Sequence, residues 1–217
     1  KNVKRVILTS TAGTVWMGTP LVESLGESNW NDVSRKNLSP YMKGKTLGER
    51  AAWDFVEKNK DINFTSILPQ LVFGPGIGDH RECSTMKMFN MFAKKELPIA
   101  PKMKAGISDV RDVAKLHVAA MTAEGAVGKR FIASSDEPLH FKEVTGILKN
   151  AGYKKASTRQ APKFLLKIMS LFDDQVKGLL PMVGERQTVA NQETYQILGW
   201  EPTPMDQSLI ETAESIS

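Results

Sequence analysis

Residues 4–14 read "KRVILTSTAGT", and this stretch indicates how the fold begins. The apolar run Val6-Ile7-Leu8 predicts a strand over about residues 5–9. A strand in which polar and apolar residues do not alternate is typical of a parallel sheet that is covered on both faces. A parallel sheet cannot form from one strand, so its neighbours must come from other parts of the polypeptide.

Strands and helices alternate through the residues that follow. The sequence predicts a helix over about residues 41–58, a second strand that ends near Pro69, a helix over 110–123 and a third strand over 128–134. This alternation predicts an α/β fold with a parallel sheet.

Further helices are expected outside this alternating region. One is predicted over residues 84–95, and after Leu139 the chain is predicted to be mostly helical, with Gly199 ending one helix as its C-cap. The expected late helices cover about residues 140–152, 162–180, 191–200 and 206–216. We expect them to form a smaller domain beside the sheet.

The composition is that of a globular protein and argues against a membrane span and against nucleic-acid binding. The chain has 217 residues, of which 41% are apolar and 24% charged, and no apolar run approaches the length of a membrane span. The net charge is +5, but the lysines are scattered among acidic residues, and no aromatic residues lie between them. We therefore expect neither a nucleic-acid nor a membrane partner.

The first residues and the cysteine content indicate a longer polypeptide and a reducing compartment. The predicted strand begins almost at once after Lys1, and no initiator methionine precedes it. We therefore expect this chain to be the later part of a longer polypeptide. Cys83 is the single cysteine, which rules out an internal disulfide and suits a reducing compartment, so we expect a cytoplasmic protein.

A tyrosine and a lysine stand four positions apart where the first predicted helix begins. Tyr41 and Lys45 should point the same way, since residues four apart are neighbours on a helix surface. The apolar positions of this helix are expected to form one inward face: Leu47, Ala51, Ala52, Phe55 and Val56. The pair is by itself ordinary for a helix surface. It gains weight because it lies near the carboxyl ends of two predicted strands, where parallel sheets bind ligands.

Five blocks of sequence together resemble one family: "LTSTAGTV", "SPYMKGKTLGERAAWDF", "ILPQLVFGPG", "SDVRDVAKLHVAAM" and "LGWEPTPMDQSLIETAES". In this order and spacing they are similar to the extended short-chain dehydrogenase/reductases, most closely the dihydroflavonol-reductase-like aldehyde and ketone reductases. The resemblance covers essentially the whole chain. It implies the C-terminal part of a doubly wound (Rossmann) parallel sheet, with the C-terminal half of the dinucleotide-binding domain in residues 1–75 and 105–135. It also implies a smaller, mostly helical substrate-binding domain in residues 76–104 and 136–217.

The resemblance also implies the site residues. Thr11, Tyr41 and Lys45 would be the catalytic set, with Ser10 as a neighbouring alternative for the hydroxyl. The expected cofactor is NADP(H), with NAD(H) as the alternative. The residues expected to bind it are Tyr41, Lys45, Pro69, Val72 and Ser84. The expected substrate is a small, fairly apolar aldehyde or ketone, and the expected oligomeric state is a monomer or a homodimer.

The chemistry of a reductase explains why a tyrosine and a lysine would be paired. Hydride addition leaves negative charge on the carbonyl oxygen, so a proton must arrive with the hydride. An ammonium group about 4–5 Å from a phenol favours its ionised form by roughly 3–4 kcal/mol at an effective dielectric constant near 20. A hydroxyl at Thr11 would hold the carbonyl oxygen in line with Tyr41.

Part of the cofactor site that the family uses is not in this sequence. The glycine-rich phosphate turn and the residue that reads the adenosine ribose precede this region in the family. Residues 74–78, "GPGIG", do not fit the spacing of that fingerprint. We therefore expect the isolated chain to bind cofactor weakly and to be inactive.

Two alternative functions stay open. The first is a nucleotide-sugar epimerase or dehydratase of the same superfamily, although Ala12 and Gly13 stand where a dehydratase needs an acidic pair, and Met42 stands where epimerases more often have a small residue. The second is a non-catalytic dinucleotide-binding sensor or scaffold.

Three other features of the sequence have ordinary explanations. His80, Glu82 and Cys83 lack a second ligand cluster, so we expect no metal. We expect His117 to be a packed helix histidine, and Asp109 and Asp112 to order the start of its helix.

Overall fold

The computed structural model describes residues 3–16, 25–36, 38–78, 82–93, 100–171 and 189–216. The chain divides into two compact units. The first comprises residues 1–70, 111–136 and 188–202, and the second comprises residues 71–110, 137–187 and 203–217. The assignment of a dinucleotide-binding and a substrate-binding domain stays a prediction.

A three-stranded parallel sheet forms the centre of the first unit. Its strands are β1 (Arg5–Thr9), β2 (Asn63–Pro69) and β7 (Lys129–Ala133), in the order β1-β2-β7. The β2 segment is buried at six consecutive residues after Asn63, as expected for a strand covered on both faces. The predicted α/β fold with a parallel sheet is confirmed.

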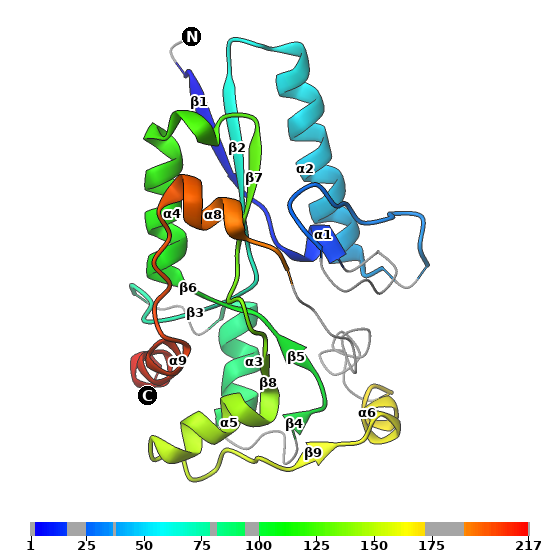
Figure 1. Ribbon diagram of the computed structural model, residues 1–217. Helices are drawn as coiled ribbons and strands as arrows, with labels where there is room; N and C mark the ends of the chain where they lie inside the picture. Colours follow the sequence, from blue (N-terminus) through cyan, green and yellow to red (C-terminus); the bar gives the residue numbers. More distant parts are fainter. Residues whose placement is uncertain are drawn as a thin grey trace. The chain divides into compact units, whose positions relative to one another are not determined.

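Helices cover both faces of this sheet, as Figure 1 shows. On one face lies α2 (Pro40–Lys58), with the short helix α1 (Gly13–Trp16) near its start. On the other lie α4 (Val110–Thr122), the single-turn helix η1 (Glu124–Ala126) and α8 (Gln192–Leu198). The core beneath α4 and α8 includes Ile67, Leu116, Phe131 and Trp200.

The predicted inward face of α2 is wrong. Leu47 is 46% exposed and Phe55 57% exposed, and Ala51 is exposed as well. Only Ala52 and Val56 of the expected set are half-buried, and the buried positions of the helix are Met42, Thr46 and Glu49. The helix is therefore rotated away from its apolar stripe, because Glu49 takes part in a buried polar cluster.

The second unit is built from short strands and helices. Its sheets each have two strands: β3 (Leu71–Phe73) with β6 (Ile107–Asp109), β4 (Ala100–Pro101) with β9 (Gln160–Ala161), and β5 (Lys104–Ala105) with β8 (Leu139–His140). Its helices are α3 (Ser84–Ala93), α5 (Phe141–Asn150), α6 (Lys163–Met169) and α9 (Met205–Ser215). Phe73, Phe89, Leu148 and Leu209 contribute to its core.

The late helices agree with the sequence where they are described. The predicted helix over residues 162–180 is confirmed for Lys163–Met169, and residues 172–188 lie outside the described residues. The two-residue strands were not predicted. Helix α8 packs into the core of the first unit through Leu198.

Gly199 is the C-cap of α8, as the sequence predicts. Its φ of 61° and ψ of 40° are left-handed, and its N–H donates to the carbonyl of Tyr195 at 3.1 Å. A Cβ built on Gly199 would meet no atom within 4 Å, so the backbone conformation alone requires glycine here.

We predict that Gly199→Ala lowers the free energy of unfolding by about 1 kcal/mol, because an L-residue is strained in the left-handed region. Gly48→Ala is the matched control, since Gly48 lies inside α2 with open space around its Cβ position. There alanine should raise the free energy of unfolding by about 0.5–1 kcal/mol. Urea unfolding measures the free energy of unfolding of both variants. Equal effects of the two substitutions would contradict the assignment of Gly199 as a left-handed C-cap.

Candidate functional site

The start of α2 places Tyr41 and Lys45. Ser39 is the N-cap, and its hydroxyl accepts a hydrogen bond from the N–H of Met42 at 3.2 Å, while Pro40 occupies the first turn. Tyr41 is 62% exposed, and Lys45, one turn later, is half-buried. The predicted position of both residues at the beginning of this helix is confirmed.

Tyr41, Lys45 and Glu49 follow one another at four-residue spacing along a single row of α2. Each step of four residues turns the helix by about 40°. Exposure falls along the row accordingly, from the exposed Tyr41 through the half-buried Lys45 to Glu49, which is 2% exposed. The orientation of Glu49 therefore determines where the other two side chains point.

Lys45 reaches the carboxyl end of β1. Its Nζ donates a hydrogen bond to the carbonyl oxygen of Thr9, the last residue of that strand, at 3.0 Å. Thr11 follows two residues later, and the N–H of Ala12 donates to the carbonyl of Pro69 at 2.9 Å. The structure thus brings the segment of Thr11, the end of β2 and the ammonium group of Lys45 to one edge of the sheet.

The segment after β1 is held by hydrogen bonds and by close packing. The hydroxyl of Thr14 donates to the carbonyl of Thr11 at 2.8 Å, and the N–H of Gly13 donates to the Thr11 hydroxyl at 3.3 Å. A Cβ on Gly13 would lie 2.6 Å from the sulfur of Met42. Because Gly13 has no side chain, α2 can pack this closely on the segment that carries Thr11.

Other predicted site residues belong to the second unit. Val72 lies in β3, opposite Ser108, and Ser84 is the first residue of α3. Their contribution to cofactor binding stays a prediction. His80 lies outside the described residues, and the described residues hold no group of three or more metal-ligating side chains. No described helix has the length and apolar character to cross a membrane.

His117 is a further residue at this edge. It is half-buried, and its Nδ1 lies 2.7 Å from the carbonyl of Val113 in its own helix. A carbonyl only accepts, so Nδ1 donates, and in the neutral ring Nε2 accepts from the Thr9 hydroxyl, 2.7 Å away. Thr9 is therefore held by His117 through its side chain, while its carbonyl holds Lys45. The sequence identified His117 only as a packed histidine.

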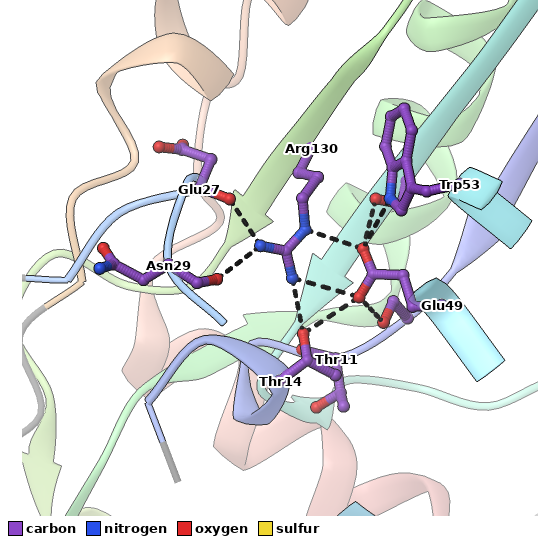
Figure 2. A network of polar contacts seen from close by, with 9 residues as sticks. Thr11, Thr14, Glu27, Asn29, Glu49, Trp53 and Arg130 are labelled. Atoms are coloured by element: carbon purple, nitrogen blue, oxygen red, sulfur yellow. Dashed lines mark hydrogen bonds and ion pairs between the residues drawn. The ribbon is translucent and has the colours of Figure 1, made fainter. Parts of the chain in front are cut away.

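Behind the site lies a buried ion pair, shown in Figure 2. Arg130 of β7 donates from Nε to Oε1 of Glu49 at 2.8 Å and from one terminal nitrogen to Oε2 at 3.2 Å. The hydroxyls of Ser10 and Ser66 donate to the same carboxylate at 2.5 Å and 2.7 Å. The pair therefore joins α2 to β2, to β7 and to the residue that directly follows β1.

The remaining hydrogens of Arg130 are also used. One terminal nitrogen donates to the backbone carbonyls of Glu27 and Asn29 at 2.6 Å and 2.7 Å, and the other donates to the hydroxyl of Thr14 at 2.9 Å. The guanidinium carbon lies 3.7 Å from the ring centre of Trp30. All five N–H groups of Arg130 have an acceptor, which is what a buried guanidinium requires.

Electrostatics keep Glu49 ionised. Burial alone would raise the pKa of its carboxyl, but the hydrogen bond and charge of Arg130, with the hydroxyls of Ser10 and Ser66, hold the pKa below its usual value. Burial raises the pKa of Glu27, and the charge of Glu193 adds to this rise.

A pocket of about 870 Å³ lies beside α2 at the opposite end of the strands. Trp30, Trp53 and Val127 line it together with the first residues of β2 and β7. None of the predicted site residues is among the described residues that line it; the predicted set is Thr11, Tyr41, Lys45, Pro69, Val72 and Ser84. The carboxyl edge of the sheet, rather than this pocket, is where the candidate catalytic groups gather.

We predict that Glu49→Gln destabilises the protein by about 3–5 kcal/mol at neutral pH, because it leaves the guanidinium of Arg130 buried without a counter-charge. The folded pKa of Glu49 is lowered, so its stabilisation is present above the unfolded value near 4.5 and is lost as pH falls below it. Denaturant unfolding from neutral pH down to about pH 3 should show a steeper loss for the parent than for the variant.

Glu57→Gln is the control, because Glu57 is an exposed glutamate on the same helix. Its effect should stay within about 0.5 kcal/mol at every pH. Equal effects at the two positions would contradict the role given to the buried pair.

We predict energetic coupling between Thr9 and His117. Thr9→Val and His117→Leu each remove one partner of the same hydrogen bond, so their effects on the free energy of unfolding should be non-additive by about 0.5–1.5 kcal/mol. Ser34→Ala combined with His117→Leu is the control, since Ser34 bonds to Asp32 and not to the histidine. Additivity in the first pair would show that the two side chains do not interact in solution.

The sequence of this chain is similar to the sequences of known reductases. The chain is 32% identical over 149 residues to the NADPH-dependent methylglyoxal reductase GRE2 of Saccharomyces cerevisiae, covering 61% of this chain and 44% of that protein. It is 29% identical over 220 residues to the cinnamoyl-CoA reductase CAD2 of Medicago truncatula, covering 99% of this chain and 61% of that protein.

Solved structures agree on the fold. The crystal structure of Gre2 from Candida albicans in complex with NADPH superposes with a TM-score of 0.76 at 23% identity, covering 100% of this chain and 64% of that one. The chain thus spans less than two thirds of the length of each of these relatives. Residues 1–133 match the model of the NAD dependent epimerase/dehydratase family, and the chain belongs to that family.

Proposed function

We propose that the protein to which this chain belongs is an NADP(H)-dependent reductase that converts the carbonyl of a small, fairly apolar aldehyde or ketone to an alcohol. The observation that carries the proposal is the hydrogen bond from Lys45 to the carbonyl of Thr9, at 3.0 Å. It holds an ammonium group at the carboxyl edge of the sheet, one helical turn from an exposed tyrosine. The reductase names of GRE2 and CAD2 support the same class of reaction.

Each catalytic residue has a role that its position supports. Tyr41 would give its phenolic proton to the oxygen of the substrate, and it is exposed to do so. Lys45 would offset, through its charge, the negative charge that develops on the Tyr41 oxygen as the proton passes to the substrate. The Thr11 hydroxyl, fixed near the end of β1 by the bonds of its own segment, would hold the substrate oxygen in line with Tyr41.

The residues at the sheet edge fit a nicotinamide cofactor. NADP(H), when bound, would supply the hydride. Lys45 carries three donors, one of which is used on Thr9, so it can also bind ribose hydroxyls. Tyr41 would share that contact, Pro69 would lie against the nicotinamide, and Val72 and Ser84 would bind its carboxamide and the phosphates. The choice of NADP(H) over NAD(H) rests on the names of the relatives, GRE2 among them.

A nucleotide-sugar epimerase or dehydratase is the alternative from the same superfamily. A dehydratase needs an acidic pair after the catalytic hydroxyl, and here Ala12 is fully buried while Gly13 packs on Met42. A side chain at position 13 would require Met42 to move. Met42 itself is buried at the position after Tyr41, where epimerases more often have a small residue. The local packing therefore favours the reductase.

A non-catalytic sensor or scaffold is the alternative from another class. Such a protein has no need for a proton donor beside a lysine, yet this chain holds the lysine in place with a specific hydrogen bond. The presence of Thr11, Tyr41 and Lys45 in one chain, with Lys45 held at the end of β1, favours catalysis. The active form in this proposal is a monomer or a homodimer.

We predict that Tyr41→Phe, made in the complete protein, lowers kcat for the reduction of methylglyoxal or another small aldehyde by about 10²–10⁴-fold, because the proton donor is lost. Lys45→Gln should lower kcat and also raise the KM for NADPH. Lys43→Gln is the matched control, since Lys43 is exposed on the same turn. The measurement is NADPH oxidation followed by absorbance.

Two outcomes would overturn the proposal. If Tyr41→Phe oxidises NADPH at the parent rate, Tyr41 is not the acid and the mechanism is wrong. If the complete protein interconverts UDP-sugars and does not reduce simple aldehydes, the epimerase alternative replaces it.

A further inference from the structure

The pocket beside α2 has the dimensions of a small-molecule site. Its volume of about 870 Å³ lies within the range of roughly 300–1,000 Å³ that such sites occupy. It lies at the first residues of β2 and β7, and every described residue that lines it belongs to the first unit. We call it the amino-end pocket.

Aromatic and aliphatic side chains line part of the amino-end pocket: Trp30, Trp53, Val56, Ile62 and Phe64. The rings of Trp53 and Phe64 meet edge to face, with their centres 4.6 Å apart. A wall of this kind takes the apolar body of a ligand out of water, and the faces of its rings attract positive charge. The wall therefore suits a ligand that is apolar, cationic or both.

Three of the four described basic side chains that line the amino-end pocket are engaged. Every N–H of Arg130 has an acceptor, and Nζ of Lys129 lies 2.6 Å from Oε1 of Glu193. A terminal nitrogen of Arg50 donates to a backbone carbonyl at 2.9 Å. An anionic ligand would have to displace one of these contacts or rely on Lys60, which is exposed.

The acidic side chains of the amino-end pocket are less engaged. Oε1 of Glu27 is buried and has no hydrogen-bond partner among the residues that the structure describes. Burial raises the pKa of this carboxyl, and the charge of Glu193 adds to the rise, so its ionised form lacks full compensation. Asp54 and Glu57 are exposed on α2 and form no ion pair with a described residue. The pocket therefore lacks a donor of positive charge, above all at Glu27, where water does not reach Oε1.

The apolar wall and the carboxylate of Glu27 together select a class of ligand. A neutral apolar molecule would leave Oε1 of Glu27 without a donor, and an anion would add negative charge beside it. A protonated amine gives N–H donors to the carboxylate, and its apolar body covers the aromatic wall. We propose that the amino-end pocket binds an amphipathic organic cation, a primary amine with an apolar or aromatic body, and that Glu27 is its counter-charge.

This binding site is separate from the candidate catalytic site. Lys45 lies at the carboxyl end of β1, whereas the amino-end pocket lies at the first residues of β2 and β7. The proposal is therefore independent of the proposed reductase function, and its test requires neither cofactor nor carbonyl substrate.

The test compares ligands that share one apolar body and differ in charge. Isothermal titration calorimetry of the complete protein uses phenylbutylamine, phenylbutanol and phenylbutyrate, which are a cation, a neutral molecule and an anion. The amine should bind about tenfold more tightly than the alcohol, because a charge-assisted hydrogen bond to a desolvated carboxylate is stronger than a neutral one. Phenylbutyrate should bind more weakly than the alcohol, because it brings a second negative charge to Glu27.

A matched pair of variants locates the binding. Glu27→Gln removes the charge and keeps the size of the side chain, so the affinity for the amine should fall about tenfold, to that for the alcohol. Glu124→Gln is the control, because Glu124 is an exposed glutamate of the same unit and is not among the described residues that line the pocket. The proposal is overturned if the amine binds no more tightly than the alcohol, if no ligand binds, or if Glu27→Gln binds the amine like the parent.

A second measurement needs no substitution at Glu27, in case that variant does not fold. Fluorine NMR of protein that contains fluorotryptophan reports on each of the four tryptophans of this chain. Phenylbutylamine should shift the resonances of Trp30 and Trp53, which line the pocket, and leave those of Trp16 and Trp200 in place. Unchanged resonances of Trp30 and Trp53 at a saturating concentration of the amine would overturn the proposal.

Discussion

The contact between Arg130 and Glu49 is the constraint on which the first unit depends. Every N–H of the guanidinium is used, and the acceptors come from α2, from the segment after β1 and from residues 27–29. A buried charge without its partner is costly, so these segments are held together as a set. Because Glu49 shares one row of α2 with Lys45 and Tyr41, the same contact sets the direction in which the candidate catalytic side chains point.

Much of this fold is predictable from local sequence. The strands β1, β2 and β7 follow from short apolar runs between turn signals, and α2, α4 and α8 from their periodicity and caps, as Gly199 illustrates. The face that α2 buries could not be predicted in this way. Apolar periodicity selects Leu47 and Phe55, yet the helix buries Glu49, whose partner Arg130 is 81 residues away. The strands of two residues in the second unit were missed because they are too short to show a period.

The residues of the candidate site could likewise be predicted where the signal is local, but not where it depends on a distant contact. Tyr41, Lys45 and Thr11 could be found because their spacing and their place at strand ends are local properties of the sequence. His117 was assigned only to packing. Its hydrogen bond to Thr9 joins residues 108 positions apart, and the sequence around neither residue predicts this contact. A signal for the ion pair did exist: Arg130 stands directly before the apolar residues Phe131-Ile132-Ala133 of its strand, and a charge buried there must find a partner.

A buried ion pair is a poor way to gain stability, because apolar side chains of similar volume often stabilise a core as well or better. What it supplies here is specificity of orientation. An apolar contact between α2 and the sheet would tolerate several rotations of the helix, including the one that buries Leu47 and Phe55. The bidentate bond between Arg130 and Glu49 is compatible with one of them. That rotation leaves two apolar residues in water, and it directs Lys45 to the carbonyl of Thr9. The polar core thus fixes the rotation of α2 that brings Lys45 to the end of β1.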